Sequence, residues 1–224
     1  MEMKINKRLR EISAFIENNS QVIDIGCDHG LLGIYLCLNK KNIHVISSDI
    51  NEKPLSKAYE NTKKYHLLEK IEILKGNGLE CVSKNTDTVV ISGMGGVTIC
   101  DILKNIEDYP NIKKIIVSPN NDFIYTRKKI TKHCYQLNRE KIVLENGKYY
   151  LISEYIIGKK KINYFFGKLE SNNETISYYN YLYQTNLDII NKLPRKRILK
   201  KIKLKIDNYH INRKFSFKKN DKER

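Results

Sequence analysis

Short apolar runs alternate with helical stretches over the first 158 residues of the chain. Five runs are compact and rich in Ile and Val, as expected of buried strands, and they lie at 22–25, 43–47, 71–74, 88–91 and 112–117. Before and between them, apolar residues recur at helical spacing, over residues 7–17, 31–38, 54–65, 97–106 and 123–133. Alternation of this kind predicts a doubly wound α/β sheet of parallel strands with helices on both faces.

The pattern changes after residue 133. Two strand-like runs follow at 136–144 and 149–157, and the residues between them include Asn146-Gly147. Asn-Gly between two apolar runs is the strongest short signal for a β-hairpin. We therefore expect a seven-stranded α/β sheet, with five parallel strands and a terminal antiparallel hairpin.

Two longer helical patterns follow Gly158. Residues 171–193 carry apolar side chains at Ile176, Tyr179, Tyr183, Leu187 and Ile190, and residues 195–209 carry them at Ile198, Ile202, Ile206 and Tyr209. Pro194 separates the two stretches. We expect an antiparallel coiled-coil hairpin whose seam these residues form. The chain then divides into a domain over 1–158 and an extension over 159–224.

The charge of the chain is concentrated in the extension. The 224 residues carry a net charge of +16, and residues 159–224 account for +12 of it, with 18 basic and 6 acidic residues. A nearly neutral body with a strongly basic end favours binding of a polyanion such as nucleic acid. The alternative is a solvated, lysine-rich helical surface without a partner.

Several classes of protein are disfavoured by the sequence. No apolar run reaches the length of about 18 residues that a membrane span needs, and Met1–Ser13 lacks an apolar signal core. The five cysteines never form C-x-x-C, which argues against a disulfide framework or a zinc site. We therefore expect a cytoplasmic protein that has no membrane partner, binds no metal and acts as a monomer.

Acidic residues and glycines follow the first predicted strand, in the run Asp24-Ile25-Gly26-Cys27-Asp28-His29-Gly30. Ligands of open parallel sheets bind beyond the carboxyl ends of the strands, and glycines there let the backbone approach a ligand closely. The glycine spacing is not G-x-G-x-x-G, and carboxylates repel phosphate, so a dinucleotide is disfavoured. A carboxylate instead favours a ligand that carries a cation or an amine.

The next two strands end in polar residues that complete such a pocket. Asp49 ends the second strand, at the distance past the glycine turn where an acid typically binds ribose hydroxyls. The third strand runs into Gly76-Asn77-Gly78, and Asn77 can both donate to and accept from the edge of an adenine ring. Together, the three strand ends predict a pocket for a nucleoside with a positive centre.

Four motifs resemble those of one family. The opening KRLREIS, the run DIGCDHG, the glycine-rich Ser92-Gly93-Met94-Gly95-Gly96 and Ser118-Pro119-Asn120 are similar to segments of the bacterial tRNA (adenine-22-N1)-methyltransferases, over roughly residues 4–158. The basic helical hairpin is similar in position and type to the C-terminal extension of that family. The resemblance implies a Rossmann-like methyltransferase sheet and S-adenosylmethionine as cofactor. It also implies methyl transfer to N1 of adenine 22 in the tRNA D-arm, with the basic helices binding the tRNA.

The resemblance further implies a cofactor site, formed by Asp24, Gly26, Cys27, Asp28, Asp49, Ile50, Asn77, Gly78, Gly93, Met94 and Gly95. Two positions depart from the family pattern. Asn77 stands where the family has Asp, which removes a charge beside the cofactor adenine, and Ser118 stands where the family has Gln.

The chemistry of N1 methylation points to three catalytic residues. Adenine N1 already has an in-plane lone pair, so the enzyme must expose and orient the base rather than deprotonate it. A carboxylate that accepts a hydrogen bond from the N6 amine would orient the base and stabilise its developing positive charge. Asp28 is the first candidate, with His29 beside it and Asn120 as a second polar contact. The alternative role for Asp28 is to cap the following helix.

Two other functions remain open at the level of sequence. The protein could methylate another RNA base, such as one in ribosomal RNA. It could also be a non-catalytic RNA-binding protein on a methyltransferase fold, although the intact Asp24, Gly26 and Asp49 favour an enzyme.

Overall fold

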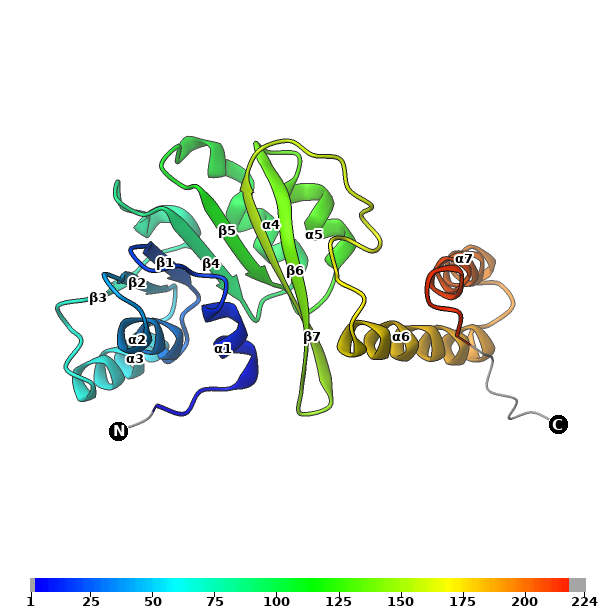
Figure 1. Ribbon diagram of the computed structural model, residues 1–224, viewed down its shortest axis with the longest axis horizontal. Helices are drawn as coiled ribbons and strands as arrows, with labels where there is room; N and C mark the ends of the chain where they lie inside the picture. Colours follow the sequence, from blue (N-terminus) through cyan, green and yellow to red (C-terminus); the bar gives the residue numbers. More distant parts are fainter. Residues whose placement is uncertain (1–2, 218–224) are drawn as a thin grey trace. The chain divides into compact units, whose positions relative to one another are not determined.

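The fold is built on one seven-stranded sheet in the order β3-β2-β1-β4-β5-β7-β6 (Figure 1). The computed structural model describes residues 3–217. The strands are β1 (Gln21–Ile25), β2 (His44–Asp49), β3 (Ile71–Lys75), β4 (Thr88–Ser92), β5 (Lys114–Ser118), β6 (Tyr135–Glu145) and β7 (Lys148–Ile157). The first five strands are parallel, and β7 pairs antiparallel with both β5 and β6. The predicted fold class is confirmed.

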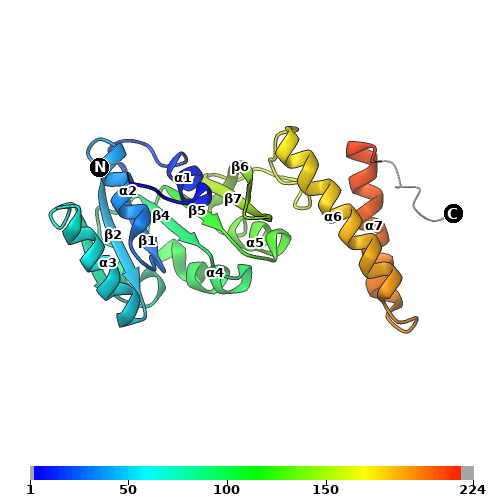
Figure 2. The same cartoon turned by 90° about the horizontal axis from the view of Figure 1, so that it is seen from below.

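Alternating strand residues supply a separate core on each face of the sheet. Val22 of β1 belongs to one core, with Ile12 and Leu36, whereas the adjacent Ile23 belongs to the other, with Ile99. Both faces of these strands are therefore buried, as their continuous Ile/Val runs require. The helices are α1 (Lys7–Ser13), α2 (Leu31–Asn39), α3 (Glu52–Lys64), α4 (Gly96–Ile102) and α5 (Phe123–Ile130), with 3₁₀ turns η1 (Gly78–Cys81) and η2 (Leu103–Asp108). Figure 2 shows α1 and α2 on one face and α4 and α5 on the other.

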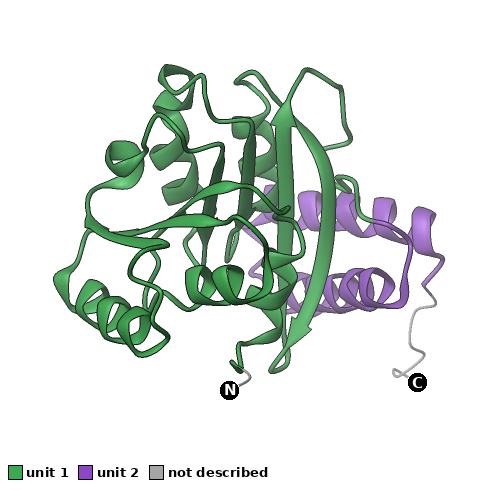
Figure 3. Ribbon diagram, turned by 60° about the vertical axis from the view of Figure 1, so that its left-hand side comes forward, with its two compact units in different colours: residues 1–169 green, residues 170–224 purple. Residues whose placement is uncertain are grey.

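The chain forms two compact units, residues 1–169 and residues 170–224 (Figure 3). The sequence division at 158 assigned residues 159–169 to the extension, but this segment is fixed to unit 1. The Arg127 guanidinium pairs with Glu140, at 2.9 Å between Nε and Oε1, and donates to the carbonyl oxygens of Tyr164 and Phe165. Glu140 in turn accepts from the backbone N–H of Lys168 at 2.8 Å. A buried ion pair with this many hydrogen bonds holds the segment in place.

Unit 2 contains the antiparallel pair of α6 (Asn173–Lys192) and α7 (Ile198–Phe215), as predicted. The ring of Tyr179, near the start of α6, stacks on Phe215, at the end of α7, with 4.9 Å between centroids. Between these ends, the Asn186 side chain donates to Asn208 at 2.8 Å, and Asn208 donates to the carbonyl oxygen of Tyr183 at 3.0 Å. Stacked rings and a satisfied buried amide pair therefore join the two helices.

The predicted seam of α7 is wrong. Ile198, Ile202 and Ile206 are 61%, 48% and 50% exposed, whereas the buried residues of this helix are Asn208 and Ile211. The amide pair of Asn208 with Asn186 turns a different face of α7 toward α6. Periodicity detects an apolar stripe on a helix, but it does not tell which face contacts the neighbour.

None of the helices in the described part of the chain is long and apolar enough to span a bilayer. Over the same residues, no cluster of three or more His, Cys, Asp or Glu side chains is arranged to hold a metal ion.

Candidate active site

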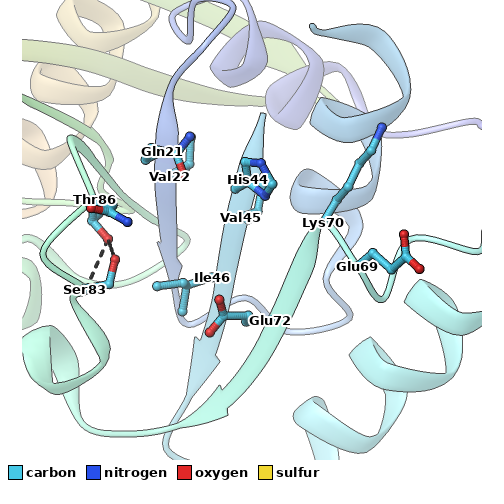
Figure 4. A pocket seen from close by; sticks show the side chains of 11 residues that line it. Gln21, Val22, His44, Val45, Ile46, Glu69, Lys70, Glu72, Ser83 and Thr86 are labelled. Carbon is cyan, nitrogen blue, oxygen red and sulfur yellow. Dashed lines mark hydrogen bonds between the residues drawn. The ribbon is translucent and has the colours of Figure 1, made fainter. Parts of the chain in front are cut away.

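One large cavity lies at the edge of the sheet opposite the predicted chemistry. It measures about 620 Å³ and is lined by residues at the amino ends of the strands, including Gln21 of β1 and His44 of β2, with Lys70 just before β3 (Figure 4). Ligands of open α/β sheets bind at the opposite, carboxyl edge. No residue predicted for the site lines this cavity. Its size alone therefore does not make it the candidate site.

A second cavity, of about 360 Å³, lies at the carboxyl ends of β1, β2 and β4. It brings together eight of the residues proposed from sequence, namely Asp24, Gly26, Cys27, Asp28, His29, Asp49, Gly93 and Met94. The strand order explains why they meet. β1 lies between β2 and β4, and the chain leaves β1 and β4 toward helices on opposite faces of the sheet. The two departing loops leave a crevice between them.

Gly26 permits the close approach of the two loops that border this cavity. Its backbone has φ of 73°, and a Cβ atom added there would lie 2.2 Å from the Met94 methyl carbon. A side chain at position 26 would therefore strain the backbone and collide with Met94. The loop is also tied to β2, because the N–H groups of Gly26 and Cys27 both donate to the Ser48 carbonyl oxygen, at 2.8 and 3.0 Å.

Asp24 is the buried acid of the cavity. Its side chain is only 4% exposed, and this burial, with a smaller contribution from the charge of Asp49, raises its pKa from 3.8 to about 7. Two carboxylates thus share a poorly solvated site. A positively charged ligand would stabilise the ionised form of Asp24, so the electrostatics favour a cation or an amine.

Asp28 and His29 lie at the same cavity with more exposed side chains. The side chain of Asp28 is 74% exposed and that of His29 is 38% exposed, with 3.5 Å between His29 Nε2 and Asp28 Oδ1. Asp28 does not cap α2, because Gly30 occupies the N-cap position and no side chain caps it. The capping alternative is therefore wrong, and the carboxylate of Asp28 is available to a second molecule. Cys27 is buried, and burial raises the pKa of its thiol far above the usual range, which disfavours the thiolate that a nucleophile requires.

Five predicted residues are not on the wall of this cavity, namely Ile50, Gly95, Asn120, Asn77 and Gly78. Asn120 holds the glycine-rich turn through two hydrogen bonds. Its side chain donates to the Gly93 carbonyl oxygen at 2.5 Å, and its backbone N–H donates to the Met94 carbonyl oxygen at 2.8 Å. Gly95 is the N-cap of α4, and Ile50 is 58% exposed. Asn120 and Gly95 are therefore placed to shape the turn around Met94.

Asn77 and Gly78 line a different cavity, of about 450 Å³, together with residues of α4 and η2. The Asn77 backbone N–H donates to Glu80 Oε2 at 2.8 Å. Ser118, the other departure from the family pattern, is fully buried at the end of β5, and no partner of its hydroxyl is found among the described residues. The Ser118 side chain is therefore shielded from any ligand that occupies the crevice.

Sequence reasoning missed the contribution of the first helix. Asn6, Arg8 and Leu9 line the 360 Å³ cavity, as do Leu31, Leu32 and Ser92. The only sequence signal for this helix was the opening motif KRLREIS, which resembles a segment of the family, but none of its residues was given a role in the site. The wall of the cavity therefore has a basic residue, Arg8, that the strand-end argument did not include.

Comparison with known proteins identifies similar chains. Residues 5–153 match the family model described as a methyltransferase domain. The curated tRNA (adenine(22)-N(1))-methyltransferase of Bacillus subtilis (strain 168) is 35% identical over 151 residues, which cover 66% of this chain and 63% of that protein. By sequence, the chain thus spans less than two thirds of the length of this relative.

Two solved structures extend the similarity over nearly the whole chain. The structure of M. capricolum TrmK in complex with S-adenosyl-homocysteine is 28% identical, with a TM-score of 0.84 over 96% of this chain and 99% of that one. The crystal structure of the B. subtilis m1A22 tRNA methyltransferase TrmK is 27% identical, with a TM-score of 0.77 over 96% and 97% of the two chains. These comparisons confirm the resemblance inferred from the motifs.

The raised pKa of Asp24 predicts how Asp24→Asn changes stability with pH. The folded protein holds this proton more tightly than the unfolded chain, so the contribution of Asp24 to stability falls as pH rises from about 4 to about 7. A shift of this size corresponds to at most about 4 kcal/mol. We expect Asp24→Asn to raise the free energy of unfolding more at about pH 8 than at about pH 5, as measured by urea denaturation of the ligand-free protein. An equal difference at both pH values would contradict this assignment.

Proposed function

The chain belongs to the methyltransferase-domain family, and we propose that it transfers a methyl group from S-adenosylmethionine to N1 of adenine 22 in the D-arm of tRNA. The observation that carries the proposal is the acidic, glycine-lined cavity at the carboxyl ends of β1, β2 and β4. The named activity of the Bacillus subtilis relative and the cofactor product bound to M. capricolum TrmK support it. We further propose that the protein acts in the cytoplasm, where its proposed substrate is found, and as a monomer.

The residues of the cavity fit S-adenosylmethionine. Its sulfonium and ammonium groups are cations, and Asp24 and Asp49 offer two carboxylates in a site where burial has already raised the pKa of one of them. Asp49 is assigned to the ribose hydroxyls. Ile50, Asn77 and Gly78, which do not line this cavity, are assigned to the adenine, so the adenine would lie outside it, toward the cavity that Asn77 and Gly78 line.

The cofactor supplies an electrophilic methyl group on a sulfonium. The residues of this chain have to hold the acceptor base in line with that methyl and keep its pairing edge exposed. Asp28 accepts a hydrogen bond from the N6 amine of the flipped adenine, which orients N1 and stabilises the positive charge that develops on the ring. His29 positions the Asp28 carboxylate, and Asn120 positions the turn of Gly93 and Met94. N1 needs no base to remove a proton before it attacks, because its lone pair is already free.

The basic residues of unit 2 bind the tRNA backbone. Arg195, Lys196 and Arg197 form an exposed run between α6 and α7, and Lys200, Lys203 and Lys205 are exposed on α7. Each contact between such a side chain and a phosphate releases counterions, which makes affinity depend steeply on salt. Unit 2 thereby provides affinity for the tRNA body.

Methyl transfer to a panel of tRNAs tests the activity directly. We expect labelled methyl groups from S-adenosylmethionine to enter tRNAs that carry adenine at position 22, with a new primer-extension stop at that adenine. An unchanged stop pattern in the presence of the protein, or methylation of ribosomal RNA instead, would overturn the proposed substrate. If the protein does not bind S-adenosylhomocysteine at all, the result favours the alternative of a non-catalytic RNA-binding protein on a methyltransferase fold.

The role of Asp28 predicts a selective loss of rate. We expect Asp28→Ala to lower the rate constant of methyl transfer at saturating tRNA by about a hundredfold or more, because the base loses its orienting acceptor. Asp28→Asn keeps a hydrogen-bond acceptor without the charge and should lose less. The matched control is Asp122→Ala, since Asp122 also has a positive φ and is exposed but does not line the cavity. Full activity of Asp28→Ala in single-turnover assays would rule out this role.

Removal of the basic run predicts a change in salt dependence. We expect the triple change of Arg195, Lys196 and Arg197 to Ala to weaken tRNA binding. The plot of log affinity against log salt should flatten by about 0.7–0.9 for each phosphate that these side chains no longer neutralise. Binding of S-adenosylhomocysteine should not change. The control is the triple change of Lys53, Lys63 and Lys64 on α3 to Ala, which removes the same charge from unit 1. Equal slopes for the two triple variants would show that only overall charge matters.

A further inference from the structure

One face of α7 exposes apolar side chains to which the proposed function assigns no role. All four are exposed, Tyr209 to 63%, and they are Ile198, Ile202, Ile206 and Tyr209. Because they recur every three or four residues, they lie along one face of the helix, and we call them the α7 stripe. The buried residues of this helix, Asn208 and Ile211, belong to another face. A contiguous exposed apolar surface of this kind is typical of an interaction site.

The α7 stripe is bordered by positive charge. The charged residues of the helix are six basic and one acidic, namely Lys200, Lys201, Lys203, Lys205, Arg213, Lys214 and Asp207. Lys201 is three residues from Ile198, and Lys205 is four residues from Tyr209, so both lysines lie along the edge of the stripe. A partner that is complementary to this face must therefore present apolar surface next to negative charge.

Unpaired nucleotides of RNA have this combination of properties. Each base has an apolar face that stacks on aromatic rings and packs against apolar side chains, and each nucleotide has an anionic phosphate. In duplex RNA the neighbouring base pairs cover these faces, so that a protein can reach them only in loops, bulges and ends. The face of α7 is therefore complementary to a loop of RNA rather than to a duplex.

A second copy of this chain fits the α7 stripe less well. Association of two stripes would bring the lysines along their edges together, and like charges across an interface disfavour binding. The stripe has four side chains, whereas a stable protein interface contains about 20–30 residues on each side. The residues after the described part of the chain, 218–224, are all polar or charged in sequence, so they offer no apolar side chain to this face.

We propose that the α7 stripe binds unpaired bases of the tRNA, an inference that rests on the proposed function and specifies what unit 2 recognises. The Tyr209 ring stacks on one base, and Ile202 and Ile206 pack against its neighbours. Lys201 and Lys205 neutralise the adjoining phosphates. Unit 2 thereby distinguishes an RNA with an open loop from a fully paired RNA, a distinction that phosphate contacts alone do not provide.

Two RNAs separate base contacts from phosphate contacts, namely a tRNA with adenine at position 22 and a fully paired RNA of equal length. We would measure the affinity of the whole chain for each RNA over a range of salt concentrations. We expect the triple change of Ile202, Ile206 and Tyr209 to Gln, a good helix former, to weaken tRNA binding by about tenfold or more. Affinity for the paired RNA should stay within about twofold of the wild-type value. The slope of log affinity against log salt should not change, because no phosphate contact is lost.

The control is the triple change of Leu38, Tyr59 and Leu68 to Gln, which removes exposed apolar side chains of similar type from unit 1 and should leave tRNA binding unchanged. Tyr209→Phe keeps the ring and should bind tRNA like the wild type. Thermal unfolding shows whether each variant remains folded, and Tyr209→Ala alone provides the test if the triple variant does not.

Three results would overturn the proposal. The first is unchanged tRNA affinity in the triple variant, and the second is an equal loss of affinity for both RNAs. The third is a dimer of the wild type that the triple variant does not form, with RNA binding unaffected, which would assign the stripe to a second copy. Selective loss of tRNA affinity, in a protein whose wild type methylates no tRNA, would support the stripe and refute the proposed methyl transfer, so the two failures are distinguishable.

Discussion

The position of β1 at the centre of the parallel strands determines where chemistry can take place in this protein. The strand order reverses there, so β1 has β2 on one side and β4 on the other, and the segments after β1 and β4 leave toward opposite faces of the sheet. The backbone loops come together at one point, where Gly26 lies against Met94. Any other residue at this point would be strained by the positive φ of 73°, and the Met94 side chain would have to move.

Burial of Asp24 in that crevice lowers the stability of the folded, ligand-free protein at neutral and higher pH. Asp24 is almost completely desolvated beside Asp49, and its pKa of about 7 means that the ligand-free protein resists ionising it. Such strain is common at binding sites, because a group that is unfavourable alone becomes favourable when the complementary charge arrives. The buried carboxylate is therefore better explained by a cationic ligand than by any need of the fold, which the Ile and Val cores on the two faces of the sheet already stabilise.

The sequence predicted the elements and the strand-end residues because both depend on local pattern. Asp24 and Asp49 lie near the carboxyl ends of β1 and β2, and Gly26 and Asp28 follow β1. The order of these strands is constrained by the α/β architecture, so the meeting of these residues could be expected. Arg8 could not be found in this way, since its position depends on the contact of α1 with Tyr150, far along the chain. The packed face of α7 was missed for a similar reason. The packed face of that helix includes a polar contact, the amide pair of Asn186 with Asn208, which apolar periodicity does not detect.

The two parts of the chain differ in the sign of their charge, and this difference fits a separation of the proposed tRNA binding from the proposed methyl transfer. Residues 159–224 carry a net charge of +12, whereas the cavity wall has three carboxylates and one arginine. Because charges in solvent are screened beyond about 8–10 Å at physiological salt, each part acts on what is near it. Under the proposed function, the basic helices bind phosphates, whereas the acidic cavity disfavours them and takes a neutral purine and a cationic cofactor. RNA would then bind through its backbone while only an extruded base enters the crevice, which is the selection that the proposed methylation on the pairing edge requires.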